Sequence, residues 1–481
     1  MKQRAGVALA LATFVIAATN SVIRAANSES QSPHVDGVAD RPGWLDQYRD
    51  PAARLIGEAV SSTFAWQRLS TLTDTIGNRL SGTPALDRAI QWAADEMKGD
   101  GLENVHTERV MVPKWVRGNE RADIIAPARH AIAMLGLGNS VGTPRDGVQA
   151  ETIVVHSFEE LDARAAAARG RIVCFNAPFT TYGETVRFRS AGPSRAARYG
   201  AVAVLVRSIG PDGLRTPHTG ALQYSNDAPK IPAAAISAED AERLQRIADR
   251  GRRLVVRLAM DARFDADVES ANVIGELRGR EKPDEIVVVS GHLDSWDVGA
   301  GATDDAGGCV VSWEALRLMK KLNLRPRRTV RVVLWTNEEN GGRGGLAYRD
   351  QHRAELGKHV LMMESDGGVF RPLGFGFSGT DGARTVVKTI ASLLAGIAAD
   401  QVTTGGGGAD IGPSIQEGHI PGVSLEVDGS KYFLIHHTEA DTIDKIDPVE
   451  MAKCAAAVAV MAYVVADLPE RLGEHTGILF K

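Results

Sequence analysis

Residues 286–308 read IVVVSGHLDSWDVGAGATDDAGG. The stretch opens with four apolar residues, a run short enough to form a buried strand of a parallel sheet. His292 and Asp294 follow this run, and a glycine-rich turn with Asp304 and Asp305 comes 12 residues after the histidine. Loops at the carboxyl ends of parallel strands are where open α/β sheets bind their ligands. We therefore expect this stretch to form half of a two-metal hydrolytic site.

The chain after residue 273 alternates between strand-like and helix-like segments, which indicates βαβ units and a largely parallel sheet. The expected strands are residues 285–290, 329–336, 359–363 and 422–426, and the expected helices are about residues 308–322, 345–355, 382–397 and 448–468. The apolar run of the last helix, residues 455–466, is shorter than the ~20 residues that span a bilayer. We therefore expect a buried helix there.

Two other patterns precede this region. Residues 55–97 have helical spacing, with a helix start signal at Ser81-Gly82-Thr83-Pro84, and residues 101–116 alternate as a strand does. From residue 151 to about residue 265, short strands are expected at residues 153–155, 171–175, 201–206 and 254–258, with helices between them. This segment has no cluster of His, Asp and Glu at ligand spacing, so we expect a non-catalytic module.

The N-terminus has the pattern of a secretory signal. Lys2 and Arg4 form a basic start, residues 6–18 are almost wholly apolar, and small residues stand at Ala25 and Ala26. The apolar run is again shorter than the ~20 residues of a membrane span. This favours export to the periplasm or the extracellular space, with no stable membrane span in the mature form.

Composition narrows the function further. A chain of 481 residues predicts two or three domains, and a net charge of −5 with both signs interspersed argues against a nucleic-acid partner. Cys174, Cys309 and Cys454 each lie in an apolar stretch, as buried thiols do, and none has metal-ligand spacing. Any metal must therefore be held by histidines and carboxylates.

Four further clusters of metal-ligand residue types follow the first. They are residues 337–342 (NEENGG), 364–368 (ESDGG), 405–410 (GGGGAD) and 432–442 (YFLIHHTEADT). Each alone has an ordinary explanation, such as a solvated glutamate pair or a turn, and the role of Asp410 stays open between a functional residue and an ordinary loop carboxylate. Because all of them fall after expected strands or in loops of one α/β domain, the set indicates a metal site.

A dinuclear zinc site requires imidazoles and carboxylates, with one carboxylate bridging the ions. The residues that satisfy this count are His292, Asp304, Glu339, Asp366 and His437. Glu338, adjacent to one of these ligands, is then free to act as a general base. The carboxylate of Asp294 can accept the second N–H of the His292 imidazole. The Asp304-Asp305 turn suggests a strained backbone with a cis non-proline bond.

These motifs resemble the M28 family of zinc exopeptidases. The matching phrases are GHLDSWDVGAGATDDAGG, VLWTNEENGG, MMESDGG, YFLIHHTEADT and PVEMAKCAAAVAVMAYVVADL. The resemblance implies a three-layer α/β fold with a mixed, largely parallel central sheet, and an inserted β-rich domain similar to a protease-associated (PA) domain. The implied division is residues 1–26 as signal peptide, 27–129 as the N-terminal part of the catalytic domain, 130–265 as the PA-like insert and 266–481 as the main catalytic part.

The resemblance also assigns roles to single residues. It implies two Zn²⁺ ions, with His292 and Asp366 on one, Glu339 and His437 on the other, and Asp304 rather than Asp305 as the bridge. Glu338 is the implied base, and Asp294 lies behind the ligands. His436 stands where many related exopeptidases have tyrosine, and there it would polarise the scissile carbonyl or stabilise its oxyanion.

The implied function is that of an exported dipeptidase or carboxypeptidase acting on dipeptides or short peptides, with a homodimer left open. An aminopeptidase, an amidase or deacylase using the same metals, and a non-catalytic binding protein on the same scaffold are the alternatives. A carboxypeptidase needs cations or N–H donors for the substrate carboxylate. Arg343, Arg371 and Lys431 lie near the motifs in sequence and are candidates for that task.

Overall fold

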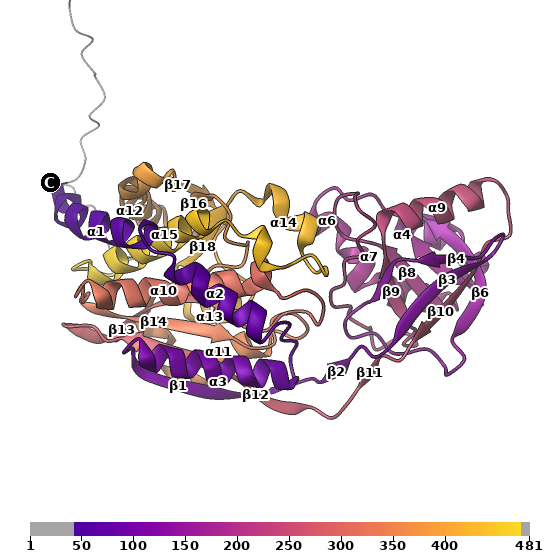
Figure 1. The fold of residues 1–481 in the computed structure, drawn as a ribbon, viewed down its shortest axis with the longest axis horizontal. Helices are drawn as coiled ribbons and strands as arrows, with labels where there is room; N and C mark the ends of the chain where they lie inside the picture. Colours follow the sequence, from indigo (N-terminus) through magenta and orange to yellow (C-terminus); the bar gives the residue numbers. More distant parts are fainter. Residues whose placement is uncertain (1–42, 473–481) are drawn as a thin grey trace, which may run out of the picture. The chain divides into compact units, whose positions relative to one another are not determined.

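The structure is a computed structural model that describes residues 43–472 (Figure 1). The expected signal peptide, residues 1–26, lies outside the described residues. The described part contains two eight-stranded sheets and a two-stranded one.

The first sheet carries the metal-ligand motifs. Its strands, in spatial order, are β1 (Glu103–Val112), β12 (Val268–Leu277), β14 (Arg328–Trp335), β13 (Lys282–His292), β15 (His359–Glu364), β18 (Gly422–Val427), β16 (Pro372–Ser378) and β17 (Gln401–Thr404). The centre is parallel from β14 through β13 and β15 to β18, while β1, β12 and β16 pair antiparallel with a neighbour. The expected mixed sheet with a parallel centre is therefore confirmed.

Helices cover both faces of this sheet. The helices α1 (Arg49–Val60), α2 (Phe64–Thr75), α3 (Pro84–Gly99), α10 (Gly307–Lys321) and α15 (Pro448–Asp467) share one core with Val287 and Val289 of β13. The alternate residues Ile286 and Val288 belong to the opposite core, together with Tyr348 of α11 (Arg343–Gln351). This alternation is what a strand buried on both faces requires, and it makes three layers.

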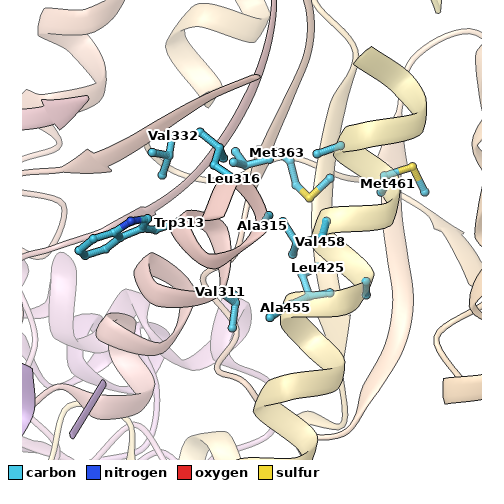
Figure 2. Packing of buried hydrophobic residues seen from close by; sticks show 14 of the residues in the cluster. Val311, Trp313, Ala315, Leu316, Val332, Met363, Leu425, Ala455, Val458 and Met461 are labelled. Atoms are coloured by element: carbon cyan, nitrogen blue, oxygen red, sulfur yellow. The ribbon is translucent and has the colours of Figure 1, made fainter. Parts of the chain in front are cut away.

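The helix α15 is the centre of the larger core. Its side chains from Cys454 to Ala466 are all buried, and it lies beside α10, with Ala315 of α10 facing Val458 of α15 (Figure 2). Among the described helices it is the one whose length and composition alone would suit a bilayer, but most of it is buried inside the protein. The expectation of a buried helix is confirmed.

The second sheet is formed by strands from residue 120 to residue 260. Its order is β4 (His130–Ile132), β3 (Glu120–Ala126), β10 (Val255–Met260), β6 (Val148–Val155), β7 (Ile172–Phe175), β8 (Ala203–Arg207), β9 (Ala233–Ile236) and β5 (Met134–Gly136). The strands from β6 to β9 are parallel. The helices of this part are α4 (Phe158–Ala163), α5 (Ala165–Ala168), α6 (Tyr182–Thr185), α7 (Arg187–Ser190), α8 (Gly192–Arg198) and α9 (Ala238–Asp249).

A two-stranded ribbon stands at the entry and the exit of this second sheet. Its strands β2 (Trp115–Val116) and β11 (Arg263–Phe264) pair antiparallel, immediately before β3 and after β10 in sequence. The chain therefore leaves the first sheet and returns to it through one paired crossing.

The helical region expected at residues 55–97 consists of three helices. The start signal at Thr83 is confirmed, because its side chain accepts a hydrogen bond from the Leu86 N–H and Pro84 is the first helical residue. The helix expected at residues 382–397 is α12 (Asp381–Ala391) followed by a 3₁₀ turn, Ser392–Ile397.

Candidate metal centre

The site lies where the parallel strands of the first sheet end. His292 is the last residue of β13, Glu338 and Glu339 follow β14, and Asp366 follows β15. Because neighbouring parallel strands end at the same edge, these side chains converge there. His437 comes from the loop after the short helix α14 (Tyr432–Ile435).

Asp304 connects two groups of side chains. Its Oδ1 lies 3.0 Å from His292 Nε2, and its Oδ2 lies 3.2 Å from His437 Nε2. On the first side, His292 Nε2 also lies 3.3 Å from Asp366 Oδ1. On the second side, His437 Nε2 lies 3.1 Å from Glu339 Oε2. The structure thus brings the five predicted ligands into two sets that share one carboxylate.

The donor set fits zinc, which is held by imidazole nitrogens and carboxylate oxygens. Burial by itself lowers the pKa of His437, but the charge of Glu339 and the hydrogen bond to Asp304 raise it to about 10. Glu339 Oε1 is buried and has no hydrogen-bond partner among the described residues. A divalent cation would balance this concentrated negative charge and give the buried oxygen a partner.

Asp305 faces away from these side chains. Its carboxylate accepts hydrogen bonds from the backbone N–H groups of His292, at 3.0 Å, and Gly308, at 3.1 Å. The predicted cis peptide bond joins Asp304 to Asp305. Asp441 holds the other side of the turn, because its two oxygens accept the N–H groups of Thr303 and Asp304. Hydrogen bonds therefore join the turn both to β13 and to Asp441 in residues 432–442.

The structure differs from expectation in how His292 is oriented. Its Nδ1 lies 2.9 Å from the backbone carbonyl oxygen of Asp294, whereas the Asp294 carboxylate is 3.9 Å away. That carboxylate accepts hydrogen bonds from the Glu338 N–H and the Ser81 hydroxyl instead. Asp294 therefore holds the histidine with its main chain and the Glu338 turn with its side chain.

Glu338 faces a cavity of about 350 Å³ beside the two sets. Burial raises the pKa of Glu338 well above its usual value; the charge of His292 opposes this, and the charges of Asp366 and Glu339 add to it. A carboxylate with a raised pKa next to the ligands has the character of a general base.

His436 lines the same cavity. Its ring stacks on that of His437 with centroids 3.6 Å apart, and its Nε2 lies 3.5 Å from Asp304 Oδ2. Burial and the neighbouring His437 hold the pKa of His436 well below its usual value, so the imidazole is neutral. His436 also falls in a cluster with Asp304 and His437 that has the spacing of metal ligands.

Sequence reasoning missed two residues that line this cavity. They are Tyr182 and Arg189, from α6 and α7 beside the second sheet. Arg189 is buried, and its guanidinium donates to the Thr219 carbonyl oxygen at 3.1 Å and to the Tyr182 hydroxyl at 2.7 Å. No local pattern marks either residue, since both come from a segment without ligand clusters.

The three cations that the sequence suggests for binding the substrate carboxylate do not line the cavity that Glu338 faces. Arg343, Arg371 and Lys431 are not among the residues that line the cavity, and Arg371 pairs with Asp428 at 3.0 Å. Asp410, whose role was left open, is buried with neither carboxylate oxygen hydrogen-bonded within the described residues. Its backbone N–H points to the carboxylate of Glu364, 3.4 Å away.

Comparisons with known proteins show the family of this chain. The model of peptidase family M28 matches residues 272–462. Mouse carboxypeptidase Q is 47% identical over 431 residues, covering 89% of this chain and 92% of the mouse protein. Human carboxypeptidase Q is 46% identical over 426 residues, with 88% and 90% covered.

Solved structures agree as well. A peptidase M28 precursor from Shewanella amazonensis superposes with a TM-score of 0.84 at 35% identity, covering 89% of this chain and 98% of that one. A zinc aminopeptidase from Bacillus subtilis shares the fold, with a TM-score of 0.65 at 21% identity over 86% of this chain and 98% of its own. The chain belongs to peptidase family M28 and is a zinc metallo-exopeptidase similar to carboxypeptidase Q.

Proposed function

We propose that this enzyme hydrolyses dipeptides and other short peptides with two zinc ions. His292 and Asp366 would hold one ion, Glu339 and His437 the other, and Asp304 both. The proposal depends on the position of the Asp304 carboxylate between two histidines. One of its oxygens lies 3.0 Å from His292 Nε2, and the other lies 3.2 Å from His437 Nε2. This is the arrangement of a carboxylate that bridges two metal ions, rather than of one that binds a single ion.

Zinc, when bound, supplies Lewis acidity that polarises a scissile carbonyl and activates water. Glu338 takes the proton of the attacking water and passes it to the leaving amine. Burial raises the pKa of Glu338, which favours its taking up the proton that it later gives to the amine. His436, held neutral, donates an N–H to the oxygen that becomes negative in the transition state.

The charges around the site favour a substrate with both ends free. Arg189 is the only Lys or Arg among the described residues that line the cavity, and it would bind the carboxylate of the substrate. A second cavity of about 350 Å³ shares Asp366, Tyr432 and Phe433 with the first. It is lined by the acidic side chains Glu364 and Glu426 but by no described cation, which suits the free amine.

End-blocked substrates test this proposal. A dipeptide, its N-acetyl form and its C-amidated form are assayed with and without a chelator. Loss of activity on blocking either end is expected for a dipeptidase, loss on amidation alone for a carboxypeptidase, and loss on acetylation alone for the alternative, an aminopeptidase. Activity that survives the chelator, or equal rates on all three substrates, would contradict the proposal.

The variant Arg189→Met tests whether Arg189 binds the substrate carboxylate. We expect a rise in KM of about tenfold or more for the free dipeptide and little change for the C-amide, since a charge-assisted hydrogen bond contributes ~1.5–3 kcal/mol. Arg371→Met is the matched control, because Arg371 lies near the motifs in sequence but pairs with Asp428 away from the cavity. Equal effects of Arg189→Met on both substrates would exclude carboxylate recognition by this residue.

The rival functions make different predictions. A non-catalytic binding protein on this scaffold would lack ligands, whereas all five candidates are present and adjacent here. An amidase or deacylase would retain activity on end-blocked compounds, so the same assay separates it.

The remaining features are also proposals. We propose that residues 130–265 form a PA-like domain inserted between two parts of the catalytic domain, residues 27–129 and 266–481, although β3, at residues 120–126, joins the same sheet. Limited proteolysis that releases this segment intact would support the division.

We also propose that the protein is exported after removal of residues 1–26 and has no stable membrane span in its mature form. N-terminal sequencing of the secreted protein checks this. The homodimer is checked by light scattering.

A further inference from the structure

The loop of the second sheet that ends at Thr219 contacts the His436-His437 pair. The Thr219 N–H donates to the His437 carbonyl oxygen at 2.9 Å, and the Thr219 carbonyl oxygen lies 3.3 Å from His437 Nδ1. The adjacent His218 ring places Nδ1 2.8 Å from the carbonyl oxygen of His436. Three hydrogen bonds thus join a segment near residue 218 to one about two hundred positions later.

The contact at His437 Nδ1 has a chemical consequence. His437 faces Asp304 and Glu339 through Nε2, so a metal on that side requires an unprotonated Nε2 and a proton on Nδ1. This proton needs an acceptor, and the acceptor beside Nδ1 is the Thr219 carbonyl oxygen, 3.3 Å away. The same oxygen accepts a hydrogen bond from Arg189, whose guanidinium nitrogen lies 3.4 Å from His437 Nδ1. Ligating histidines commonly donate their second N–H to a carbonyl or carboxylate that fixes the ring and its tautomer.

The two metal-site histidines differ in the source of this support. His292 has its acceptor two residues away, at the Asp294 carbonyl oxygen, within its own stretch of sequence. His437 has no such local support and adopts a left-handed backbone conformation with a φ of 61°. A residue with a side chain at that φ is held there by its surroundings. At His437 the surroundings include the Thr219 backbone, which bonds both its carbonyl oxygen and its ring, together with Arg189 and Trp296 beside the ring.

Thr219 is itself attached to the first metal-site stretch. Its hydroxyl donates to the Gly136 carbonyl oxygen at 2.7 Å and lies 3.3 Å from an Arg117 guanidinium nitrogen. That guanidinium pairs with both oxygens of Asp297, within residues 286–308, at 2.6 and 2.8 Å. The support of His437 is therefore a connected network that reaches both halves of the site.

We infer that His218 and Thr219 are positioning residues for the zinc held by Glu339 and His437, so that the second sheet completes the metal site. Neither residue lines the cavity that Glu338 faces. They act through the orientation of His437 and His436. The inference rests on the proposed two-zinc function and extends it, since it assigns a task to the segment that carries no metal-ligand cluster.

Zinc affinity tests this inference with full-length protein. His218→Phe keeps the ring and removes the donor, while His218→Asn restores an N–H donor near the position of Nδ1. Zinc bound per chain is measured against graded chelator concentrations. We expect His218→Phe to bind one of two zinc ions about 10–100-fold more weakly, in the range measured for residues that support ligands. His218→Asn should recover most of the loss.

Arg207→Met is the matched control. Arg207 is a buried arginine of the same sheet, and it bonds Asn176 and Asp212 rather than the histidine pair. It should change stability without changing zinc affinity. Cobalt-substituted protein adds a second readout, because the visible absorption of one site should shift in His218→Phe and not in Arg207→Met.

Unchanged zinc affinity in His218→Phe, or an equal loss in Arg207→Met, would overturn the inference. If His218→Phe does not fold, Thr219→Val carries the test, since it removes only the hydroxyl contacts to Gly136 and Arg117. Weaker binding at one zinc site is then expected, and wild-type affinity overturns the inference. A wild-type protein that binds two zinc ions but cleaves no dipeptide would contradict the proposed substrate alone, because the zinc readout still decides this inference.

Discussion

Asp304 and Asp305 have identical side chains but different surroundings. The Asp304 carboxylate lies between two histidines, whereas Asp305 accepts backbone N–H groups of β13 and α10. Burial raises the pKa of both carboxyls, but hydrogen bonds from His292 and His437 reverse the direction for Asp304 alone. Asp304 is therefore available to bind cations, while Asp305 stabilises the turn through its hydrogen bonds to the backbone.

Glu338 and Glu339 form a second pair of this kind, and they give the first prediction. Glu338→Gln should lower kcat about 10²–10⁴-fold, the usual contribution of a general base, while zinc content is retained. Glu339→Gln should lower zinc content itself, because Glu339 contacts His437 within a ligand set. Both variants are compared by metal analysis and turnover of one dipeptide. Lost zinc in Glu338→Gln, or retained activity, would contradict the assignment.

At the residue scale the sequence predicts five candidate ligands that the structure brings together, because each follows a strand or lies in a distinctive motif. It does not predict Arg189, which reaches the site from a segment about 250 residues before His437. It also does not distinguish the carbonyl of Asp294 from its carboxylate as the partner of His292. That choice depends on backbone orientation, which residue spacing does not encode.

At the scale of elements, the parallel centre of the first sheet is the most predictable part. The strands β13, β14 and β15 contain apolar runs buried on both faces, whereas β18 is only partly buried. The residue pattern predicts all four. The pattern does not predict β12, β16 and β17. Glycine interrupts the apolar residues of β12 and β16, and β17 is mostly exposed and polar. The strand β9 is Ala-Ala-Ala-Ile, and alanine has a low preference for strands.

A charged cluster joins the edge strand β1 to the end of α11, and it gives a prediction for pH. The Glu108 carboxylate lies 2.7 Å from His352 Nε2 and 3.4 Å from His106 Nε2. Burial raises the pKa of Glu108, but the hydrogen bonds from the two histidines outweigh this and bring it to about 2. Because the folded pKa is below the ordinary value of 4.5, the stabilisation is present above pH 4.5 and is lost as pH falls toward 2.

The histidines set the upper limit of this pH window. Burial lowers the pKa of His352, but Glu108 raises it above 6.5, so its contribution is lost as pH rises through the folded value. We expect Glu108→Gln to cost ~1–2 kcal/mol between about pH 4.5 and pH 6.5, after allowance for partial solvent screening, and less at pH 3 or pH 9. Urea unfolding at each pH measures this. An equal cost at all pH values would rule out the ion pairs as the source.

At the scale of the whole molecule, the two sheets come from different segments of the sequence, but residues from both segments lie at the site. Residues 182, 189, 218 and 219 belong to the second sheet's segment, and they line the cavity or support His437. The family model matches only residues 272–462, whereas carboxypeptidase Q matches 89% of the chain. The longer match includes the segment that we assign to recognition and support.

The central claim is a pair of zinc ions that share Asp304. Diffraction from crystals of the purified protein, collected at the zinc absorption edge, tests it most directly. We expect two anomalous peaks per chain, one beside His292 and Asp366 and one beside Glu339 and His437, with Asp304 in contact with both. A single peak, or two peaks of which only one contacts Asp304, would contradict the two-zinc site.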